Sequence, residues 1–345
     1  MTRIQFQHGY NHIISLENLL EAWKEFVCGK RSRKDVQEFE RDLMTNIISL
    51  HRDLVAKTYR HSAYQAFKIS DPKPRSIHKA SVRDRLLHHA IHRTLSPFFE
   101  RTFISDSNSC QTGKGTHRAL KRFGIFIDAV SQNNTRTAWV LKCDIRKFFA
   151  NIDQTILLAI IGRYIPDRDI LWLLSVIIGS FSSGVKKVGL PLGNLTSQLL
   201  VNVYMNEFDQ FVKHKLKAKY YIRYADDFVV LSDDRAYLDT VLPAMQEFLQ
   251  TGLRLSMHPN KISISTIASG VDFLGWVHFP DHRVLRTTTK KRMFKGIKLK
   301  EGKEETVQSY IGLLGHGNAW KLQQEVQAKA LKTETMPIPT ELLTP

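Results

Sequence analysis

Apolar residues in the first part of the chain recur at spacings of three and four, which is the period of a helix with one buried face. Over positions 36–54 this spacing holds for six apolar residues, and it predicts one long helix that begins at Ser32 or Asp35 and ends before Tyr59. The sequence therefore predicts a helical amino-terminal extension over residues 1–60.

From position 139 onwards, strand and helix patterns alternate. The predicted order is strand, helix, hairpin, helix and strand, at residues 139–145, 153–161, 220–231, 235–250 and 261–266. This order matches a split βαβ sandwich of the ferredoxin-like kind, an α+β fold in which the first strand lies beside the central hairpin. Asp144, near the end of the first strand, is then expected close to Asp226 on the hairpin. Pro243 is expected to kink or interrupt the following helix.

The hairpin carries two adjacent carboxylates, Asp226 and Asp227, where short turns usually recruit Gly or Asn. Two like charges at a tight tip raise the cost of ionising each other, and a divalent cation would compensate for that cost. A solvated acidic turn is the alternative interpretation. With Asp144, the pair forms an oxygen-rich site suited to Mg²⁺ and to two-metal phosphoryl transfer. Because neighbouring strand residues point to opposite faces, Asp226 is assigned as the ligand shared with Asp144, and Asp227 to a weaker role.

The charge of the chain indicates the class of its partner. Its 345 residues include 50 Lys and Arg against 33 Asp and Glu, a net charge of +17. This excess favours a polyanionic partner such as nucleic acid over a neutral metabolite, although a membrane surface could use the same charge. The longest mainly apolar run, residues 170–178, is shorter than the roughly 18 residues that span a bilayer. We therefore expect a soluble, cytoplasmic protein that binds no membrane.

Six segments occur in an order that is specific to one family. They are KPRSIHKASVRDR (73–85), KCDIRKFFANID (142–153), GLPLGNLTSQ (189–198), YADD (224–227), NKISI (260–264) and FLGW (273–276). Over nearly its full length the chain resembles the reverse transcriptases of bacterial retroelements, and YADD matches the most recognised motif of that family. The resemblance implies an RNA-directed DNA polymerase that acts on a template RNA and a primer or growing cDNA, with deoxynucleoside triphosphates (dNTPs) as substrates.

The resemblance also implies a right-hand polymerase with fingers, a ferredoxin-like palm and a helical thumb. The boundaries expected on this chain are fingers over 61–135, palm over 136–282 with a fingers segment at about 154–188, and thumb over 283–345. Nine Lys or Arg residues between positions 283 and 303 face a single acid, Glu301, and the thumb is expected to follow the phosphates of the duplex with them.

Catalytic roles are implied by the motifs residue by residue. Asp144, Asp226 and Asp227 match the metal-binding triad of the family, and the main-chain carbonyl of Ile145 is expected to complete a site for two Mg²⁺ ions, with Mn²⁺ as the alternative. Lys261 matches a lysine that protonates the leaving pyrophosphate, and a template contact is its alternative role.

Nucleotide contacts are implied in two motifs. Arg75 and Arg83 resemble the fingers residues that hold the incoming triphosphate or the template backbone, for which the charge and bidentate geometry of Arg are suited. Phe149 matches an aromatic gate that clashes with a ribose 2′-hydroxyl, so deoxynucleotides should be preferred. A core aromatic residue beside Phe148 is the alternative interpretation.

Contacts to nucleic acid are implied by FLGW, which resembles the segment that grips the primer end, and by basic residues of the fingers and thumb. The residues assigned to this role are Lys73, Lys114, Phe273, Leu274, Gly275, Trp276, Lys290, Lys291 and Arg292.

Departures from the general family pattern indicate a subclass. Most relatives carry Gln at the position of Leu192, where its amide contacts the incoming nucleotide, so an aliphatic residue there implies less discrimination. With GNLTSQ, whose Gly193 and Gln198 are expected nucleotide contacts, the chain resembles the reverse transcriptases of diversity-generating retroelements. Those enzymes copy a template-repeat RNA with frequent errors at adenines, for mutagenic retrohoming, and they work with a small basic helical accessory protein. Gln111 departs from the pattern, because an Arg is expected before the GKG loop.

Other assignments stay open. A group II intron reverse transcriptase shares YADD and FFANID, but such proteins normally add maturase regions, and only about 60 residues follow FLGWVHF here. Retron and phage-defence enzymes are shorter relatives, and the SQ dipeptide in place of SP argues against them. A catalytically inert RNA-binding scaffold is the non-enzyme alternative, to which the presence of all three aspartates and Lys261 gives little support.

Overall fold

The computed structural model describes residues 4–70 and 74–334. Lys73, assigned above to nucleic acid, lies outside the described residues, as do the first three residues of the expected extension and the last eleven of the expected thumb. The chain divides into two compact units. Unit 1 comprises Met1–Gly115, Lys142–Val230 and Asp239–Ile262, and unit 2 comprises Thr116–Leu141, Leu231–Leu238 and Ser263–Pro345.

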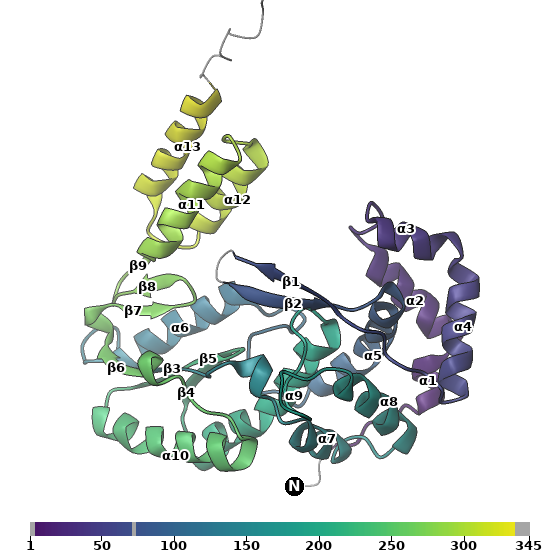
Figure 1. The fold of residues 1–345 in the computed structure, drawn as a ribbon. Coiled ribbons are helices and arrows are strands. Elements are labelled where there is room, and N and C mark those ends of the chain that lie inside the picture. Colours follow the sequence, from purple (N-terminus) through teal and green to yellow (C-terminus); the bar gives the residue numbers. More distant parts are fainter. Residues whose placement is uncertain (1–3, 71–73, 335–345) are drawn as a thin grey trace, which may run out of the picture. The chain divides into compact units, whose positions relative to one another are not determined.

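The amino-terminal part of unit 1 consists of helices. They are α1 (Tyr10–Ile14), α2 (Leu16–Val27), α3 (Lys34–Arg41) and α4 (Leu43–Val55), drawn in purple to blue in Figure 1. The prediction of one long helix is wrong at Asp42, which leaves the helical conformation (φ −117°, ψ 39°) and separates α3 from α4. The side chain of Asn46 donates a hydrogen bond to the carbonyl of Phe39 (3.0 Å), which satisfies an acceptor that the end of α3 leaves open. The apolar spacing continues across this break and therefore hides it.

A two-stranded hairpin and a long helix follow. Strand β1 (Gln65–Ile69) pairs antiparallel with β2 (Arg75–Lys79). Helix α5 (Val82–Glu100) begins after Ser81, whose hydroxyl accepts a hydrogen bond from the main-chain nitrogen of Asp84 and so caps the first turn. Helix α5 packs against α2, so the amino-terminal helices and the hairpin belong to one body.

The central sheet has the strand order β4-β5-β3-β6. Its strands are β3 (Trp139–Asp144), β4 (Tyr220–Tyr224), β5 (Asp227–Ser232) and β6 (Ser263–Thr266). The first strand in the chain, β3, therefore lies beside the β4–β5 hairpin, as the order of elements predicts for a ferredoxin-like α+β sheet. The boundary between the two units falls inside β3 and β5.

Helices account for most of the chain around this sheet. They are α6 (Thr116–Ser131), α7 (Gln154–Gly162), α8 (Arg168–Gly179), α9 (Leu195–Gln210) and α10 (Arg235–Leu253), with short helical segments at η1 (Phe148–Asn151), η2 (Phe211–Lys215), η3 (Pro259–Lys261) and η4 (Ile267–Ser269). Helix α10 continues through Pro243, so the predicted interruption is wrong. Val241, Met245 and Leu249 are buried on one face across that point, and their burial holds the helix together despite the missing N–H group.

The carboxy-terminal part of unit 2 combines a small sheet with a helical bundle. Strands β7 (Val271–Phe273), β8 (Trp276–His278) and β9 (Arg283–Leu285) are antiparallel neighbours, and α11 (Thr287–Leu299), α12 (Glu304–Leu314) and α13 (Trp320–Glu334) follow. The bundle α11–α13 packs around a small apolar core of Met293, Ile297, Val307, Leu314, Ala319, Leu322 and Val326. None of the helices within 4–70 and 74–334 has the length and hydropathy that crossing a bilayer requires.

Candidate active site

Three aspartates meet at one edge of the central sheet. Asp144 ends β3, Asp226 lies in the turn of the hairpin, and Asp227 begins β5. The main-chain nitrogen of Ile145 donates a hydrogen bond to the carbonyl oxygen of Asp226 (3.1 Å), so the backbone brings β3 and the turn together as the order of elements predicts. The turn holds no glycine, and Ala225 takes the left-handed conformation (φ +54°), which costs an L-residue about 1–2 kcal/mol.

The aspartates of the turn are half-buried and repel one another. Burial is the main cause that raises the pKa of Asp226, and the charge of Asp144 adds to it. Burial, followed by the charges of Asp226 and Asp144, raises the pKa of Asp227 to about 6. Both shifts disfavour the ionised carboxylates, so a cation bound in this turn would be stabilised by the charges that now oppose one another.

Basic side chains partly offset this negative charge. Nζ of Lys261 donates a hydrogen bond to Oδ2 of Asp144 (2.6 Å), and the Lys261 side chain is 40% exposed. Lys261 and Arg75 lower the pKa of Asp226, while Lys142 and Lys261 lower that of Asp227. The structure therefore gathers Lys261 and Arg75, two residues assigned from the sequence, around the aspartates.

The donor set suits a hard divalent cation, because it consists of carboxylate oxygens next to main-chain carbonyls. Among the described residues, no three acidic, His or Cys side chains already converge on one point as ligands. The carboxylate of Asp144 is paired with Lys261 instead. The raised pKa values of Asp226 and Asp227 are the feature of the turn that favours a bound cation.

Arg83 is engaged within the fold. Its Nη2 donates a hydrogen bond to Oδ2 of Asp53 (2.5 Å), and its guanidinium lies 5.2 Å from the ring centroid of Tyr59. These contacts tie α5 to α4, and they give Arg83 a structural role. The nucleotide contact assigned to Arg83 from the sequence stays a prediction, whereas Arg75 is exposed and acts electrostatically on Asp226.

The segment before α9 lies against strand β2. The main-chain nitrogen of His78 donates a hydrogen bond to the carbonyl of Leu192 (2.9 Å). Gly193 has φ +111°, and a Cβ at this position would lie 2.8 Å from Cγ2 of Ile77. Gly193 is therefore required by both its backbone conformation and the close approach of β2.

Phe149 belongs to η1 and is half-buried. Its ring centroid lies 5.5 Å from that of Phe148, whose side chain is 3% exposed and fills the core position. The carbonyl of Phe149 accepts a hydrogen bond from the main-chain nitrogen of Leu190 (2.8 Å), which joins η1 to the segment that carries Leu192. The partial exposure of Phe149 is compatible with the predicted gate, and the gate stays a prediction.

A pocket of about 320 Å³ opens beside Gly193 and Gln198. Its lining combines aromatic and basic side chains: Phe26, Phe67, Lys30, Arg33, Lys79 and Arg85. The carboxylate of Asp35 pairs with both Lys79 (2.7 Å) and Arg85 (2.5 Å). Because one acid faces several bases, the pocket that contains Gln198 is suited to an anionic group such as a phosphate.

The GKG loop is held together by internal contacts. Nζ of Lys114 donates hydrogen bonds to the carbonyls of Ile104 (3.4 Å) and Ser107 (3.0 Å) and to Oε1 of Gln111 (2.7 Å). Gln111 is buried and its Nε2 donates to the carbonyl and hydroxyl of Ser107. The ammonium of Lys114 thus makes three bonds inside the loop, which give it a structural role, and its assigned nucleic-acid contact stays a prediction.

The FLGW segment forms the β7–β8 hairpin. Phe273 and Trp276 are 0% and 1% exposed, so the primer contact assigned to these two side chains is corrected. Their apolar rings fill the core beneath a tight turn, in which Leu274 and Gly275 have φ of +49° and +90°. A contact to the primer through this hairpin would have to come from Leu274 and Gly275, for which it stays a prediction.

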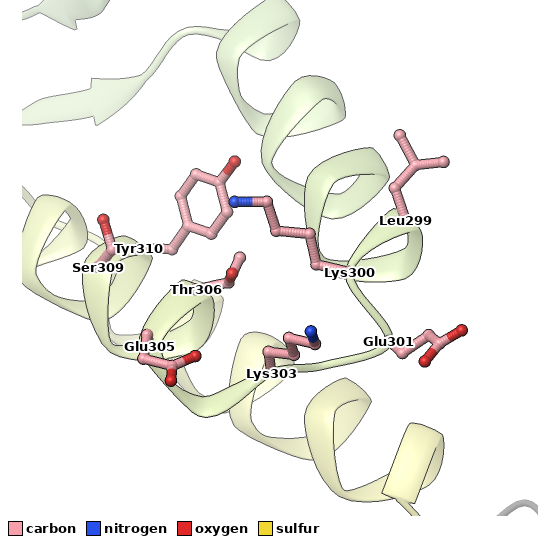
Figure 2. A pocket seen from close by; sticks show the side chains of 8 residues that line it. All are labelled: Leu299, Lys300, Glu301, Lys303, Glu305, Thr306, Ser309 and Tyr310. Carbon is pink, nitrogen blue, oxygen red and sulfur yellow. The ribbon is translucent and has the colours of Figure 1, made fainter. Parts of the chain in front are cut away.

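Three basic residues assigned to nucleic acid are exposed on α11: Lys290, Lys291 and Arg292. Nζ of Lys290 lies 3.4 Å from the carboxylate of Glu325 on α13. At the end of α11, an open hollow of about 720 Å³ separates it from the start of α12. Lys300 and Tyr310 extend towards one another across this hollow (Figure 2). The bundle thus exposes its bases, as a surface that follows a polyanion requires.

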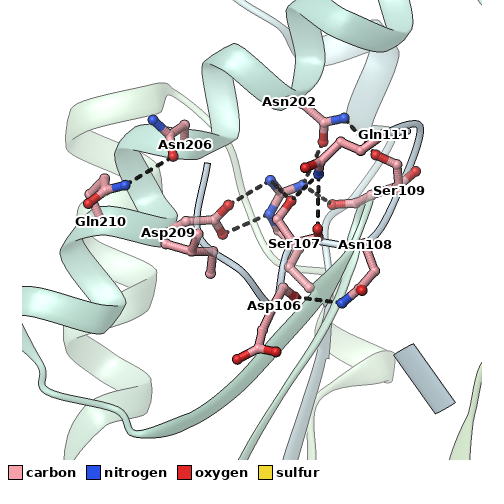
Figure 3. A network of polar contacts seen from close by, with 12 residues as sticks. Asp106, Ser107, Asn108, Ser109, Gln111, Asn202, Asn206, Asp209 and Gln210 are labelled. Atoms are coloured by element: carbon pink, nitrogen blue, oxygen red, sulfur yellow. Dashed lines mark hydrogen bonds and ion pairs between the residues drawn. The ribbon is translucent and has the colours of Figure 1, made fainter. Parts of the chain in front are cut away.

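A buried polar network below the hairpin was not predicted from the sequence. Arg223 and Asp209 form an ion pair (Nη2 to Oδ2, 2.7 Å) in which neither side chain is exposed. Figure 3 shows how the surrounding polar side chains, including Ser107 and Asn202, converge from α9 and the loop before α6. The available signals were an Arg in an otherwise apolar strand and an Asp in a mainly apolar helix.

Comparisons with known proteins find similar sequences. YkfC of Escherichia coli K12 is 24% identical over 258 residues, covering 64% of this chain and 66% of that protein. The group II intron-encoded protein LtrA of Lactococcus lactis subsp. cremoris is 22% identical over 295 residues, covering 66% of this chain and 47% of that protein. This chain thus spans about two thirds of the first relative and about half of the second.

Among solved structures, telomerase from Candida albicans, in complex with a fragment of telomeric RNA, is similar with a TM-score of 0.49 and 11% identity. The match covers 74% of this chain and 54% of that one. A family profile described as reverse transcriptase (RNA-dependent DNA polymerase) matches residues 68–278, which is more than half of the chain and includes all three aspartates. The chain therefore belongs to the reverse transcriptase family.

Proposed function

We propose that this chain copies an RNA template into DNA at the sheet edge where Asp144, Asp226 and Asp227 meet. The observation that carries the proposal is the meeting of these mutually repelling aspartates beside Lys261, on a chain of net charge +17. A partly buried cluster of like charge is stabilised when it binds a cation, and perturbed pKa values of this kind are typical of functional sites.

The residues present allow a division of labour in this reaction. Two divalent cations, Mg²⁺ or Mn²⁺, held by the aspartates and the carbonyl of Ile145 would activate the primer 3′-hydroxyl and neutralise charge on the transferring phosphate. Lys261, half-exposed and bonded to Asp144, holds a proton at Nζ beside the site and can donate it to the leaving pyrophosphate. Arg75, exposed and coupled to Asp226, is suited to the triphosphate.

Primer extension on an RNA template with purified protein tests this proposal. We expect D226N to abolish synthesis, because a neutral amide cannot replace the carboxylate as a ligand of a divalent cation. The matched control is D233N/D234N, a second pair of adjacent aspartates that is exposed after β5. Equal synthesis by D226N and the control would contradict the assignment of the site.

We further propose that the chain belongs to a diversity-generating retroelement and copies a template-repeat RNA with low fidelity at adenines. Support comes from Leu192, an aliphatic residue at the position where the general family pattern has Gln. The main-chain nitrogen of His78 donates a hydrogen bond to the carbonyl of Leu192, which holds the backbone at this position. We expect L192Q to lower misincorporation opposite template adenines, and L192M to leave the error spectrum as it is. An unchanged spectrum in L192Q would contradict the role of this position.

The genomic setting tests the same subclass without an assay. A diversity-generating element requires two near-identical repeats that differ at adenines, close to a gene for a small basic accessory protein. We propose that such a protein and the template RNA are the partners of this chain in the cytoplasm. Intron sequences on both sides of the gene would favour the group II alternative, to which the similarity to LtrA belongs.

A further inference from the structure

Arg223 lies on β4, three residues before Asp226, and its side chain has no solvent exposure. A guanidinium without water is costly unless its N–H groups all find acceptors. Each of the five N–H groups of Arg223 donates a hydrogen bond, to acceptors on α9, on the loop at residues 106–111 and in the catalytic turn itself. The side chain is therefore held in one position by three separate segments of unit 1.

The contact to α9 fixes the plane of the guanidinium. Nε and Nη2 of Arg223 donate to the two carboxylate oxygens of Asp209 at 2.8 and 2.7 Å, which is the bidentate geometry that Arg forms with a carboxylate. The hydroxyl of Tyr221 donates to the same carboxylate (2.7 Å). The two charges cancel inside the core, and the remaining N–H groups of Arg223 keep a fixed direction.

The contact to the turn uses one of those remaining groups. Nη1 of Arg223 donates to the carbonyl of Ala225 (3.1 Å) and to Oδ1 of Asn202 (3.3 Å). The carbonyl of Ala225 belongs to the peptide bond that joins it to Asp226, and Ala225 is in the left-handed conformation. The next carbonyl, that of Asp226, accepts from Ile145. Two successive carbonyl groups of the turn are thus held by hydrogen bonds, the first by Arg223 and the second by Ile145, which directly follows β3.

The contact to the loop anchors the strand as well as the side chain. Nη2 of Arg223 donates to the hydroxyl of Ser107 (3.0 Å), and the main-chain nitrogen of Arg223 donates to the carbonyl of Asp106 (3.0 Å). The main-chain nitrogen of Asn108 donates back to the carbonyl of Arg223 (3.0 Å). Figure 3 shows this loop beside α9, with Ser107 and Gln111 in contact with one another near Asn202.

We propose that Arg223 is a positioning residue for the reaction: its guanidinium, locked by Asp209, holds the Ala225 carbonyl and so sets the direction of Asp226 and Asp227. The inference rests on the proposed function of the turn as the polymerase site. It assigns a task to a buried ion pair that packing alone does not require, since an apolar pair of similar volume can fill a core at least as stably.

The variant R223K isolates the positioning contact. A lysine keeps the positive charge beside Asp209, but a single ammonium cannot reach Asp209, Ser107 and the Ala225 carbonyl together. The matched control is Y221F, which removes a buried hydrogen bond to the same Asp209 carboxylate and leaves the five hydrogen bonds of the Arg223 side chain in place. Both variants should lower the melting temperature, so a loss of stability does not distinguish them.

Primer extension as a function of Mg²⁺ concentration distinguishes them. We expect R223K to need about ten times more Mg²⁺ for half-maximal rate and to lose roughly 10–100-fold in kcat. Losses of this size are typical when a residue that orients a metal ligand is replaced. Its KM for dNTP and its Kd for an RNA–DNA duplex should stay within about twofold of the wild type, and Y221F should keep the wild-type Mg²⁺ curve. An R223K curve that coincides with that of Y221F would overturn the proposal.

A second variant covers the case in which R223K does not fold. D209N keeps one acceptor for Arg223 and loosens the lock, so its Mg²⁺ curve should shift in the same direction by a smaller amount. If neither variant folds while Y221F does, the pair is a folding determinant and the positioning role is rejected. If the wild type itself extends no primer, the proposed function fails. If the wild type is active and the variants keep its Mg²⁺ curve, only the positioning role fails.

Discussion

The proposed catalytic turn of unit 1 and the bundle α11–α13 of unit 2 are stabilised in opposite ways. Below the turn, the side chains of Arg223 and Asp209 are charged and fully buried, and hydrogen bonds with defined directions hold them. In the bundle the buried residues are apolar, while Lys290, Lys291 and Arg292 are exposed. Burial inside the protein makes a hydrogen bond both stronger and more exacting, whereas apolar contacts tolerate small shifts.

The difference matches what each region would have to do. A metal site needs a few oxygen atoms placed to within about half an ångström, which requires directional bonds below it. A surface that follows a phosphate backbone needs charge without fixed geometry, because a polyanion offers the same contact at many positions. The position of the charges, inside or outside, thus separates a site that places atoms from a surface that binds a chain.

The largest expected effect that sharpens this comparison comes from D227N. Because it removes a proposed metal ligand, we expect synthesis to fall by at least about a thousandfold. The pKa of Asp227 is raised to about 6 in the fold and is near 4 in an unfolded chain, so its ionised form opposes folding above pH 6 and not below pH 4. Metal-free D227N should therefore be more stable than the wild type by about 2 kcal/mol at pH 7.5.

Thermal unfolding in EDTA at pH 7.5 and pH 4 checks the sign of this effect. The gain in stability should fall below about 1 kcal/mol at pH 4, where the Asp227 carboxyl is protonated in the folded state and about half protonated in the unfolded chain. A D227N protein that is less stable than the wild type at pH 7.5 would show that the carboxylate contributes to folding even without a cation.

The next largest effect is on the stability of unit 2, where alanine substitutions at two glycines test the apolar packing. A Cβ at Gly317 would lie 2.1 Å from Cζ3 of the buried Trp276, while a Cβ at Gly312 in α12 meets nothing within 4 Å. We expect G317A to lower the free energy of unfolding by about 1–3 kcal/mol through overpacking. G312A should raise it by up to about 1 kcal/mol, since alanine favours a helix. Urea unfolding of both proteins gives the comparison, and equal effects would contradict the close packing of Trp276.

Acid should destabilise unit 1, because the histidine His88 is buried in its neutral form. Burial, followed by the charge of His61, lowers the pKa of His88 to about 3, well below its value near 6.5 in an unfolded chain. The contribution of neutral His88 to the free energy of unfolding is therefore complete above pH 6.5 and is lost as the pH falls towards 3. The loss at pH 5 should be about 2 kcal/mol.

Urea unfolding at pH 8 and pH 5 measures this loss. H88Q should unfold with a smaller dependence on pH than the wild type, whatever its stability at pH 8. H214Q, which changes an exposed histidine, is the control and should keep the wild-type dependence. Equal dependence in both variants would contradict the assignment of the loss to His88.

The smallest expected effect concerns the exposed bases of the bundle. K291A removes one exposed charge from α11, and K34A removes one from the outer side of α3. We expect K291A to weaken binding of an RNA–DNA duplex about two- to threefold at 0.1 M salt and to reduce the slope of log K against log salt by less than about one. K34A should change neither quantity. Binding by fluorescence anisotropy over a range of salt concentrations checks both.

The order of the elements was predictable because it depends on local patterns. The spacing of apolar residues located α7, α10 and the β4–β5 hairpin, and the ferredoxin-like order then placed β3 beside the hairpin. The same patterns gave wrong predictions at two positions, where the structure differs from what the local sequence indicates. Asp42 breaks a helix whose apolar spacing is continuous, and Pro243 lies inside a helix that its buried face keeps intact.

The candidate site was predictable in its acids and less so in its bases and apolar residues. Asp144 and Asp226 are brought together by strands whose order can be derived, whereas a lone lysine such as Lys114 carries no sign of whether its ammonium faces solvent or a loop carbonyl. Trp276 likewise gave no sign of its burial. The partners of Arg223 come from three distant segments, so no window of the sequence contains the network.

The hydrogen bonds from Arg223 to Ser107 and from Lys261 to Asp144 join residues 116 and 117 positions apart. Contacts between residues so distant in the chain form late, because long loops must close first. A ribosome adds residues at roughly 5–20 per second, so the three aspartates are present for seconds before Lys261 is synthesised. During that interval the hydrogen bond from Lys261 to Asp144 cannot form, so a nascent chain, or a fragment that stops before position 261, carries the three aspartates without this compensating base.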